Sequence, residues 1–571
     1  MLDRTPTTPN LANHALLIGI DLLCLVVATL VVASLLLLLG FSDLEYSILA
    51  AVLITAGIAW YGVWRFFSTQ RIRVWMTHLV VVTLIFTLAT VLASQWLDTT
   101  RDGQGYHSEA ILSLAEGWNP YRTDAPANTI YPEWTGLFSK GAWVNAAVLY
   151  RLTGNVEAGK AFSMVLLLAS LAVAYATFKT QPNLPARHAA ILSFLLAFNP
   201  VSVYQLFSFY VDGQLASCLV ILVCLLLLLA RHFDRLLLLA LCMVALYIVN
   251  VKLNGAIYLS LLLGGYVLWL WMQRRAERWW VLGSLIVTGL IAVGLVGYNP
   301  YISQYVREFL ATGNPFYPTQ WYELIQIDIN TPVGLLNQNR WTRLALSILS
   351  QSQVGLEPGT LKIPFFIFPQ ELLNFRYPDT RLGGFGPFFS GGLILTAIIA
   401  LAWLWRQRNV FAHIRSEFRQ MSSAAFPGLI VFLLLLNVLI SDQGWWARYA
   451  PQLWMLPVLT AALALSSSLV WVRRSALALV FTLFINVVLI VCVYVALGVL
   501  DQSTLRQDLT QLQVQSVTTP IEVNFNRMPM TQWRFERWNI AYRVTPDLPV
   551  CAEGQKVRNV VYSLSIVCGD G

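Results

Sequence analysis

Residues 80–121 read VVVTLIFTLATVLASQWLDTTRDGQGYHSEAILSLAEGWNPY, and they change abruptly from apolar to polar. The apolar run, which begins near residue 75 and ends at Trp96, has the length of about 20 residues that a membrane-spanning helix needs. Tryptophan is typical of the membrane–water interface. Two aspartates, a histidine and a glutamate follow directly. The stretch therefore predicts a helix that ends at the membrane surface and a polar loop that begins there.

A short amphipathic helix is predicted within this loop. Ser108 has the hydroxyl side chain that favours an N-cap position. A helix that begins there places Ala110, Ile111 and Leu114 on one side. Because this segment is too short to span a bilayer, we expect it to lie flat on the surface. Residues 139–152 predict a second helix of this kind.

The whole chain has the composition of a membrane protein. It has 571 residues, of which 57% are hydrophobic and 12% charged, and a soluble domain carries about twice that charged fraction. Apolar runs of spanning length recur, which predicts an all-α polytopic membrane protein with about thirteen transmembrane helices. The predicted spans are 11–39, 45–66, 75–97, 159–178, 188–209, 213–230, 235–250, 255–273, 279–297, 389–405, 424–441, 450–471 and 475–499.

The charges between these spans predict the orientation. Six basic clusters all fall on the cytoplasmic side if the N-terminus is cytoplasmic, as the positive-inside rule requires. The net charge of +8 is thereby assigned to membrane topology rather than to nucleic-acid binding. The loops 98–158 and 298–388 and the tail 500–571 then face outward. We expect a multi-pass protein of a bacterial inner or plasma membrane with its site on the extracytoplasmic face.

Three regions are predicted along the chain. Residues 1–74 form two extra N-terminal membrane helices, 75–499 form the membrane core with its outer loops, and 500–571 form a small extracytoplasmic domain with some strands. Cys551 and Cys568 lie in this tail, where an oxidising exterior would allow them to pair.

The first outer loop resembles that of the GT-C glycosyltransferases, integral membrane enzymes that use polyprenyl-phosphate-linked sugars. The resemblance rests on residues 98–121, in which Asp98 and Asp102 precede the pattern Y-H-x-E-A-I-x-x-L-x-x-G-W-N-P-Y. It covers roughly residues 75–470. It implies two surface helices after an early span, an acidic residue at the start of the loop as catalytic base, and a variable outer loop that covers the site.

Glycosyl transfer to a hydroxyl needs a carboxylate that takes the acceptor proton and positive groups near the leaving phosphate. Asp102 is the first choice for the base because it is nearest to the YHSE motif, and Asp98 is the second. His107 and Glu109 are candidates for positioning the acceptor or binding a metal. No cofactor is required by these residues, and a divalent cation is left as an alternative.

The other candidates lie in outer turns. Asp212 follows FSFYV, which is similar to a motif of eukaryotic lipid-linked glucosyltransferases, although D-G is also a common turn pair. Lys252 and Arg448 are candidates for binding the donor phosphate. The alternative is that both side chains only extend to the membrane–water interface. Arg448 is followed by Tyr449, as in a related R-Y of GT-C members. Arg381, which is close to Asp379 in the sequence, is a further candidate for binding the donor phosphate. The alternative is that these two residues only stabilise a turn.

The sequence thus favours a glycosyltransferase that moves a hexosyl or pentosyl group from a polyprenyl-phosphate donor to a glycan, lipid or protein acceptor. A polysaccharide polymerase or O-antigen ligase is a related alternative. A lipid-linked-sugar transporter or flippase is a third, but such proteins usually carry charged sites near the bilayer midplane and internal repeats. Asp21 is the main charged residue within a predicted span. A non-catalytic scaffold would tolerate replacement of the outer acids.

Overall fold

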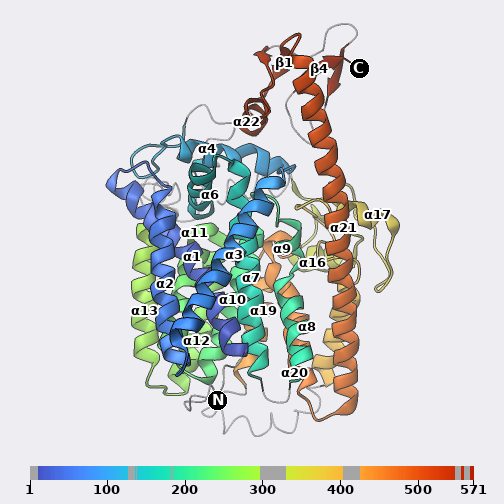
Figure 1. Ribbon diagram of the computed structural model, residues 1–571. Helices are drawn as coiled ribbons and strands as arrows, with labels where there is room; N and C mark the ends of the chain where they lie inside the picture. Colours follow the sequence, from blue (N-terminus) through green and yellow to red (C-terminus); the bar gives the residue numbers. More distant parts are fainter. Residues whose placement is uncertain are drawn as a thin grey trace, which may run out of the picture.

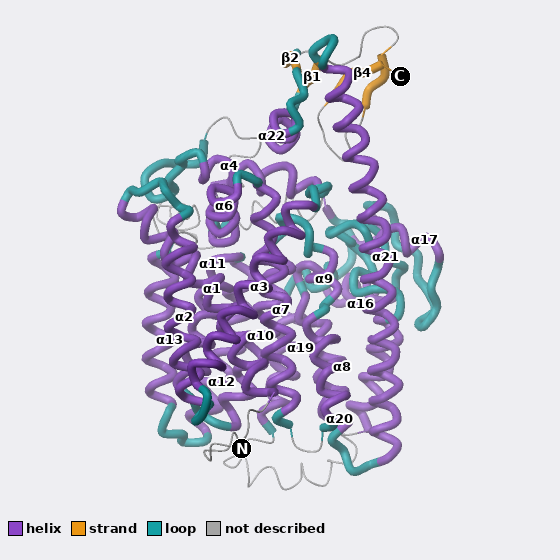
Figure 2. The backbone as a smooth tube through the Cα atoms, viewed as in Figure 1, coloured by secondary structure: helices purple, strands orange, loops and turns teal. Residues whose placement is uncertain are grey.

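The computed structural model shows a bundle of upright apolar helices with a small domain that projects from one end (Figure 1). Helices make up most of the backbone, and the four named strands lie in the projecting tail (Figure 2). The structure describes residues 11–126, 135–136, 138–181, 184–295, 330–402, 425–526, 528–546, 555–558 and 566–570.

Thirteen apolar helices occupy the predicted spans in the described part of the chain. Seven are long and apolar enough to cross a membrane: α1 (Leu11–Leu39), α2 (Tyr46–Phe66), α3 (Arg71–Gln95), η2 with α7 (Val156–Lys179), α10 (Asp212–Arg231), α12 (Leu253–Met272) and α21 (Val470–Ser516). Six are shorter: α8 (Ala186–Ala197), α11 (Arg235–Val251), α13 (Arg278–Gly294), Phe389–Ala402, α19 (Phe426–Ile440) and η6 with α20 (Pro451–Leu465). The all-α polytopic architecture is confirmed, and thirteen crossings stay a prediction.

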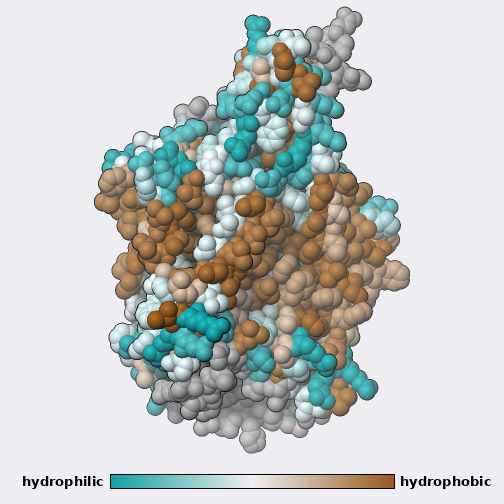
Figure 3. Space-filling model, in the orientation of Figure 1, coloured by the Kyte–Doolittle hydropathy of each residue, from teal (hydrophilic) through white to brown (hydrophobic). Residues whose placement is uncertain are grey.

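The outside of the bundle carries a band of apolar side chains between two polar ends (Figure 3). On α3, Val80, Leu84 and Leu88 are each more than half exposed and lie four residues apart, so they share one face. An exposed apolar face of this extent suits contact with lipid rather than water. At the centre, the apolar window of α10 is completely buried by its neighbours.

The span predicted at 188–209 is broken near one end. Helix α8 ends at Ala197, and Asn199 caps a separate short helix, α9 (Pro200–Tyr204), by accepting a hydrogen bond from the Val201 amide at 3.0 Å. The cause is Pro200, because the residue before a proline is pushed out of the α-helical region. The break directs the chain that follows toward the loop at residues 98–107.

The predicted boundary at residue 499 falls inside a single continuous helix. Helix α21 has 47 residues and continues beyond the bundle into the tail. Leu505, Leu509 and Leu512 are buried on one face of its projecting part and pack against Phe535. This spacing of four and three residues is a helical signal that the sequence already contains.

The tail domain is a four-stranded sheet in the order β2-β1-β4-β3. Strand β1 pairs in parallel with β2 and antiparallel with β4, which pairs antiparallel with β3. Cys568 in β4 is disulfide-bonded, and Cys551 lies outside the described residues. The elements are β1 (Ile521–Asn524), α22 (Pro529–Arg537), β2 (Tyr542–Val544), β3 (Gln555–Arg558) and β4 (Ile566–Asp570).

The two helices predicted in the first outer loop are present, with one correction. Ser108 is not an N-cap, because helical backbone continues through it from η1 (Gly103–His107) into α4 (Ser108–Ala115). Its hydroxyl instead donates back to the carbonyl of Gln104 at 2.9 Å. The backbone kinks at Gly105, inside η1. The second helix, α6 (Gly141–Thr153), is buried over most of its length.

Candidate functional site

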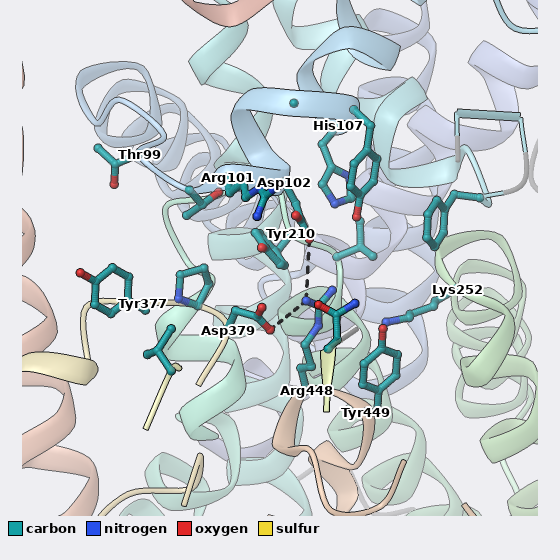
Figure 4. A pocket seen from close by; sticks show the side chains of 18 of the residues that line it. Thr99, Arg101, Asp102, His107, Tyr210, Lys252, Tyr377, Asp379, Arg448 and Tyr449 are labelled. Atoms are coloured by element: carbon teal, nitrogen blue, oxygen red, sulfur yellow. Dashed lines mark hydrogen bonds and ion pairs between the residues drawn. The ribbon is translucent and has the colours of Figure 1, made fainter. Parts of the chain in front are cut away.

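A cavity of about 550 Å³ lies at the end of the bundle that we predict to face outward. Its lining comes from the first loop, from the turns before α10 and α12, from the segment 376–381, from the turn before η6 and from the tail. Figure 4 shows its main side chains. The residues that line the cavity include Arg101, Asp102, His107, Tyr210, Lys252, Arg376, Tyr377, Asp379, Arg381, Arg448, Tyr449 and Met528.

Asp98 organises the loop but does not line the cavity. One carboxylate oxygen accepts hydrogen bonds from the amide and hydroxyl of Thr100, at 2.8 and 2.6 Å, and the other accepts from the Phe209 amide at 2.8 Å. The side chain of Asp98 is fully buried. A Cβ on Gly103 would lie 2.1 Å from that carboxylate, so this close turn needs glycine there.

Asp102 is the carboxylate of the loop that faces the cavity. Its side chain is 25% exposed, and its Oδ2 lies 3.8 Å from Nη1 of Arg448. In Figure 4 the two side chains point toward each other. Asp98 and Asp102, which sequence patterns could not rank securely, therefore differ in their surroundings. Asp98 is closed off by three donors, whereas Asp102 is open to a ligand.

The surroundings of Asp102 also change its acidity. Burial raises the pKa of Asp102; the charge of Arg448 and a hydrogen bond with Tyr210 lower it, and nearby Asp379 raises it, with a net increase. A carboxylate whose pKa is moved toward neutrality is a stronger base in its ionised form. The ionised form is lost as the pH falls through this raised pKa.

Replacing Tyr210 with phenylalanine is expected to move the acid limb of any Asp102-dependent activity to higher pH. Loss of the hydroxyl removes a hydrogen bond that favours the ionised carboxylate, so the pKa of Asp102 rises further. The measurement is the rate against pH for wild type and Tyr210→Phe, with Tyr377→Phe as a control from the same cavity. An unchanged acid limb in Tyr210→Phe would contradict this assignment.

His107 lines the same cavity as a neutral side chain. Burial, and then the charge of Arg448, lower its pKa to about 3. The Trp143 indole donates to its Nδ1 at 2.7 Å, which leaves the proton on Nε2. His107 can therefore donate one hydrogen bond into the cavity but carries no charge at neutral pH.

Glu109, the second candidate for acceptor or metal binding, is buried in α4 and does not line the cavity. Side chains two residues apart on a helix point in different directions, so His107 and Glu109 do not converge on one point. Among the described residues, no group of three or more His, Cys, Asp or Glu is placed to hold a metal ion.

Asp212, Lys252 and Arg448 form one buried charge cluster. Asp212 Oδ1 accepts from Lys252 Nζ, and its Oδ2 accepts from Arg448 Nε at 3.0 Å and from Gln205 at 3.3 Å. Asp212 is fully buried and does not line the cavity. The structure thus places it behind the two cations as their shared counter-ion, away from the position expected of an acceptor-binding or metal-binding residue.

The two cations face the cavity against aromatic rings. Lys252 Nζ lies 4.1 Å from the centre of the Tyr449 ring, and the Arg448 guanidinium lies 4.8 Å from that of Tyr210. Burial alone lowers the pKa of Arg448, but Asp212 and Asp379 outweigh it and raise its pKa. Arg448 therefore stays charged. Its bonds to Asp212 and Asp379 use Nε and Nη1.

Asp379 and Arg381 complete this wall from the segment between α17 (Pro369–Asn374) and the helix Phe389–Ala402. Asp379 Oδ1 accepts from Arg448 Nη1 at 3.0 Å, and its Oδ2 lies 3.6 Å from Arg381 Nη2. Arg381 also donates a hydrogen bond to the side chain of Asn330, and its guanidinium lies 4.9 Å from the centre of the Trp446 ring. Residues 298–329 of the predicted loop 298–388 lie outside the described residues.

Sequence reasoning did not select Tyr210, Tyr377 or the tail residue Met528, which also line the cavity. Tyr210 is the tyrosine of the FSFYVD motif (207–212), so its aromatic neighbours were a usable signal. Met528 had none, because a single methionine in a polar tail gives no indication of its contacts.

Comparisons with known proteins give distant similarities only. No family model and no curated protein matches the chain. The chain is similar to the crystal structure of ArnT from Cupriavidus metallidurans bound to undecaprenyl phosphate, with a TM-score of 0.43 and 12% identity over 85% of this chain and 97% of that one. For ArnT in the apo state the TM-score is 0.41 and the identity 13%, with the same coverage. The functional interpretation therefore has to stand on the residues of the site.

Proposed function

We propose that the protein is a glycosyltransferase that moves a sugar from a polyprenyl-phosphate donor to a hydroxyl acceptor on the extracytoplasmic face. The observation that carries this proposal is the opposition of Asp102, a partly exposed carboxylate with a raised pKa, to Arg448 and Lys252 in one cavity. A base and a phosphate-binding wall are the two elements that this reaction needs from a protein.

In the proposed reaction, Asp102 accepts the proton of the acceptor hydroxyl while its oxygen attacks the anomeric carbon. The bond between that carbon and the donor phosphate oxygen breaks, and the electron pair leaves with the prenyl phosphate. Attack from the side opposite to the phosphate inverts the anomeric configuration. Arg448 and Lys252 stabilise the charge that develops on the phosphate, and Asp212 behind them keeps both cations in place.

The apolar band around the bundle supports a lipid-linked donor (Figure 3). A prenyl chain can stay in the bilayer while its phosphate reaches a cavity at the end of the bundle. The phosphate would then approach from the membrane side, where Lys252 lies between two membrane helices, α11 and α12. Asp102 belongs to a loop beyond the helix ends, from which a polar acceptor has access.

The test is a transfer assay with the purified protein in liposomes. Polyprenyl-phosphate sugars of several kinds are supplied with an extract of envelope glycans and lipids, and both the released prenyl phosphate and the mass of the glycosylated product are measured. We expect release that depends on acceptor and is lost in Asp102→Asn. Lipid movement between leaflets without sugar transfer would contradict the proposal and favour a flippase.

A further inference from the structure

The tail domain reaches back to the loop that carries Asp102. Helix α22 lies between the tail sheet and α4 (Figure 1). Just before it, Met528 is 2% exposed and lines the cavity. The tail therefore contributes directly to the cavity wall, although it is separated from the first loop by more than 400 residues of sequence.

Arg534 of α22 is buried at this contact. Its side chain is 1% exposed. Its Nη1 donates to the side-chain oxygen of Gln104 at 2.9 Å, and its Nη2 donates to the main-chain carbonyl of Asp98 at 2.6 Å. The same Nη2 lies 3.0 Å from Glu157. One guanidinium thus binds both ends of the segment 98–104.

Asp102 lies between these two attachment points. Glu157 accepts a hydrogen bond from the main-chain amide of Asp98 at 3.1 Å and forms an ion pair with Lys160 at 2.5 Å. Within the segment, the Gln104 amide donates to the Thr100 carbonyl at 3.0 Å. A guanidinium has a fixed planar geometry, so its two hydrogen bonds set the distance between the Asp98 carbonyl and the Gln104 side-chain oxygen. The orientation of Asp102 follows from that separation.

We propose that Arg534 is a positioning residue for Asp102 and that the tail domain is therefore a part of the catalytic assembly. The inference rests on the proposed function, in which Asp102 is the base. Arg534 does not line the cavity, and it acts through the segment 98–104. Lys252 and Arg448, the proposed donor-binding cations, belong to other elements, and Arg448 is held by Asp212 and Asp379.

The experiment compares Arg534→Gln and Arg534→Lys with Arg537→Gln, a matched control three residues further along α22. Arg537 is exposed, and its nearest described partner is the Gly154 carbonyl at 3.5 Å. Four quantities are measured on the full-length protein: turnover, the KM for the prenyl-phosphate donor, the melting temperature, and hydrogen exchange of the peptide that covers residues 98–107.

In Arg534→Gln we expect faster exchange in that peptide, a donor KM close to that of wild type, and turnover lower by about a hundredfold, the loss typical of a misplaced catalytic group. Arg534→Lys should recover part of the turnover, because an ammonium can still bind the Asp98 carbonyl. Arg537→Gln should match wild type in all four measurements.

Two results would overturn the inference. Unchanged exchange of residues 98–107 in Arg534→Gln would show that the arginine does not hold the segment. Turnover and donor affinity that fall in parallel, together with the melting temperature, would show a role in folding alone. The exchange measurement needs no transfer activity, so failure of the proposed function, seen as an inactive wild type, is distinguished from failure of this inference.

Discussion

Asp102→Asn is expected to reduce sugar transfer by about two to four orders of magnitude, the usual contribution of a general base. The amide has nearly the same size and can keep the contact with Tyr210, but it cannot take a proton. Donor binding should persist, because Arg448 retains its bonds to Asp212 and Asp379. The measurement is single-turnover transfer alongside direct binding of the prenyl-phosphate donor.

Asp98→Asn is the matched comparison four residues earlier. Its carboxylate accepts from Thr100 and Phe209, and an amide group cannot accept at both of its ends. We expect lower thermal stability of the protein, with residual activity in the fraction that folds. Full transfer by Asp102→Asn, or loss of transfer by Asp98→Asn in protein of unchanged stability, would contradict the assignment of the base.

The second large effect is expected for Arg448→Lys. The substitution keeps the charge but loses the fork that binds Asp212 through Nε and Asp379 through Nη1. The leaving phosphate is then less well stabilised, and Asp212 and Asp379 are no longer held in the same arrangement around residue 448. We expect kcat to fall by about a hundredfold or more and the donor KM to rise.

The control is Arg340→Lys, which changes an arginine at an exposed position of α16 (Arg340–Leu349) with a single distant carboxylate partner, Asp442 at 3.5 Å. Exposed ion pairs of this kind contribute little, so its transfer should equal that of wild type. If Arg448→Lys also transfers at the wild-type rate, the cation does not bind the phosphate.

The helical architecture could be predicted from the sequence because membrane spans depend on local composition and length. The continuation of α21 was missed, although Leu505, Leu509 and Leu512 have helical spacing. The break at Pro200 was also readable in principle, since proline restricts the residue before it.

The site could be predicted only in part, because its chemistry depends on contacts between distant segments. Asp212 and Lys252 are 40 residues apart, and Arg448 is 236 residues from Asp212. Topology placed all three on one face, but their ion pairing, which turns Asp212 into a counter-ion, is a tertiary property. The burial of Arg534 in a polar tail helix gives no sequence signal, because charged residues on short helices are usually exposed.

The most direct measurement is an experimental structure of the protein with a polyprenyl-phosphate sugar bound, using Asp102→Asn to prevent turnover. The account predicts the phosphate within hydrogen-bonding distance of Arg448 and Lys252, with the face of the anomeric carbon opposite to the phosphate turned toward residue 102. A phosphate bound outside this cavity, or a sugar whose reactive carbon is turned away from residue 102, would contradict it.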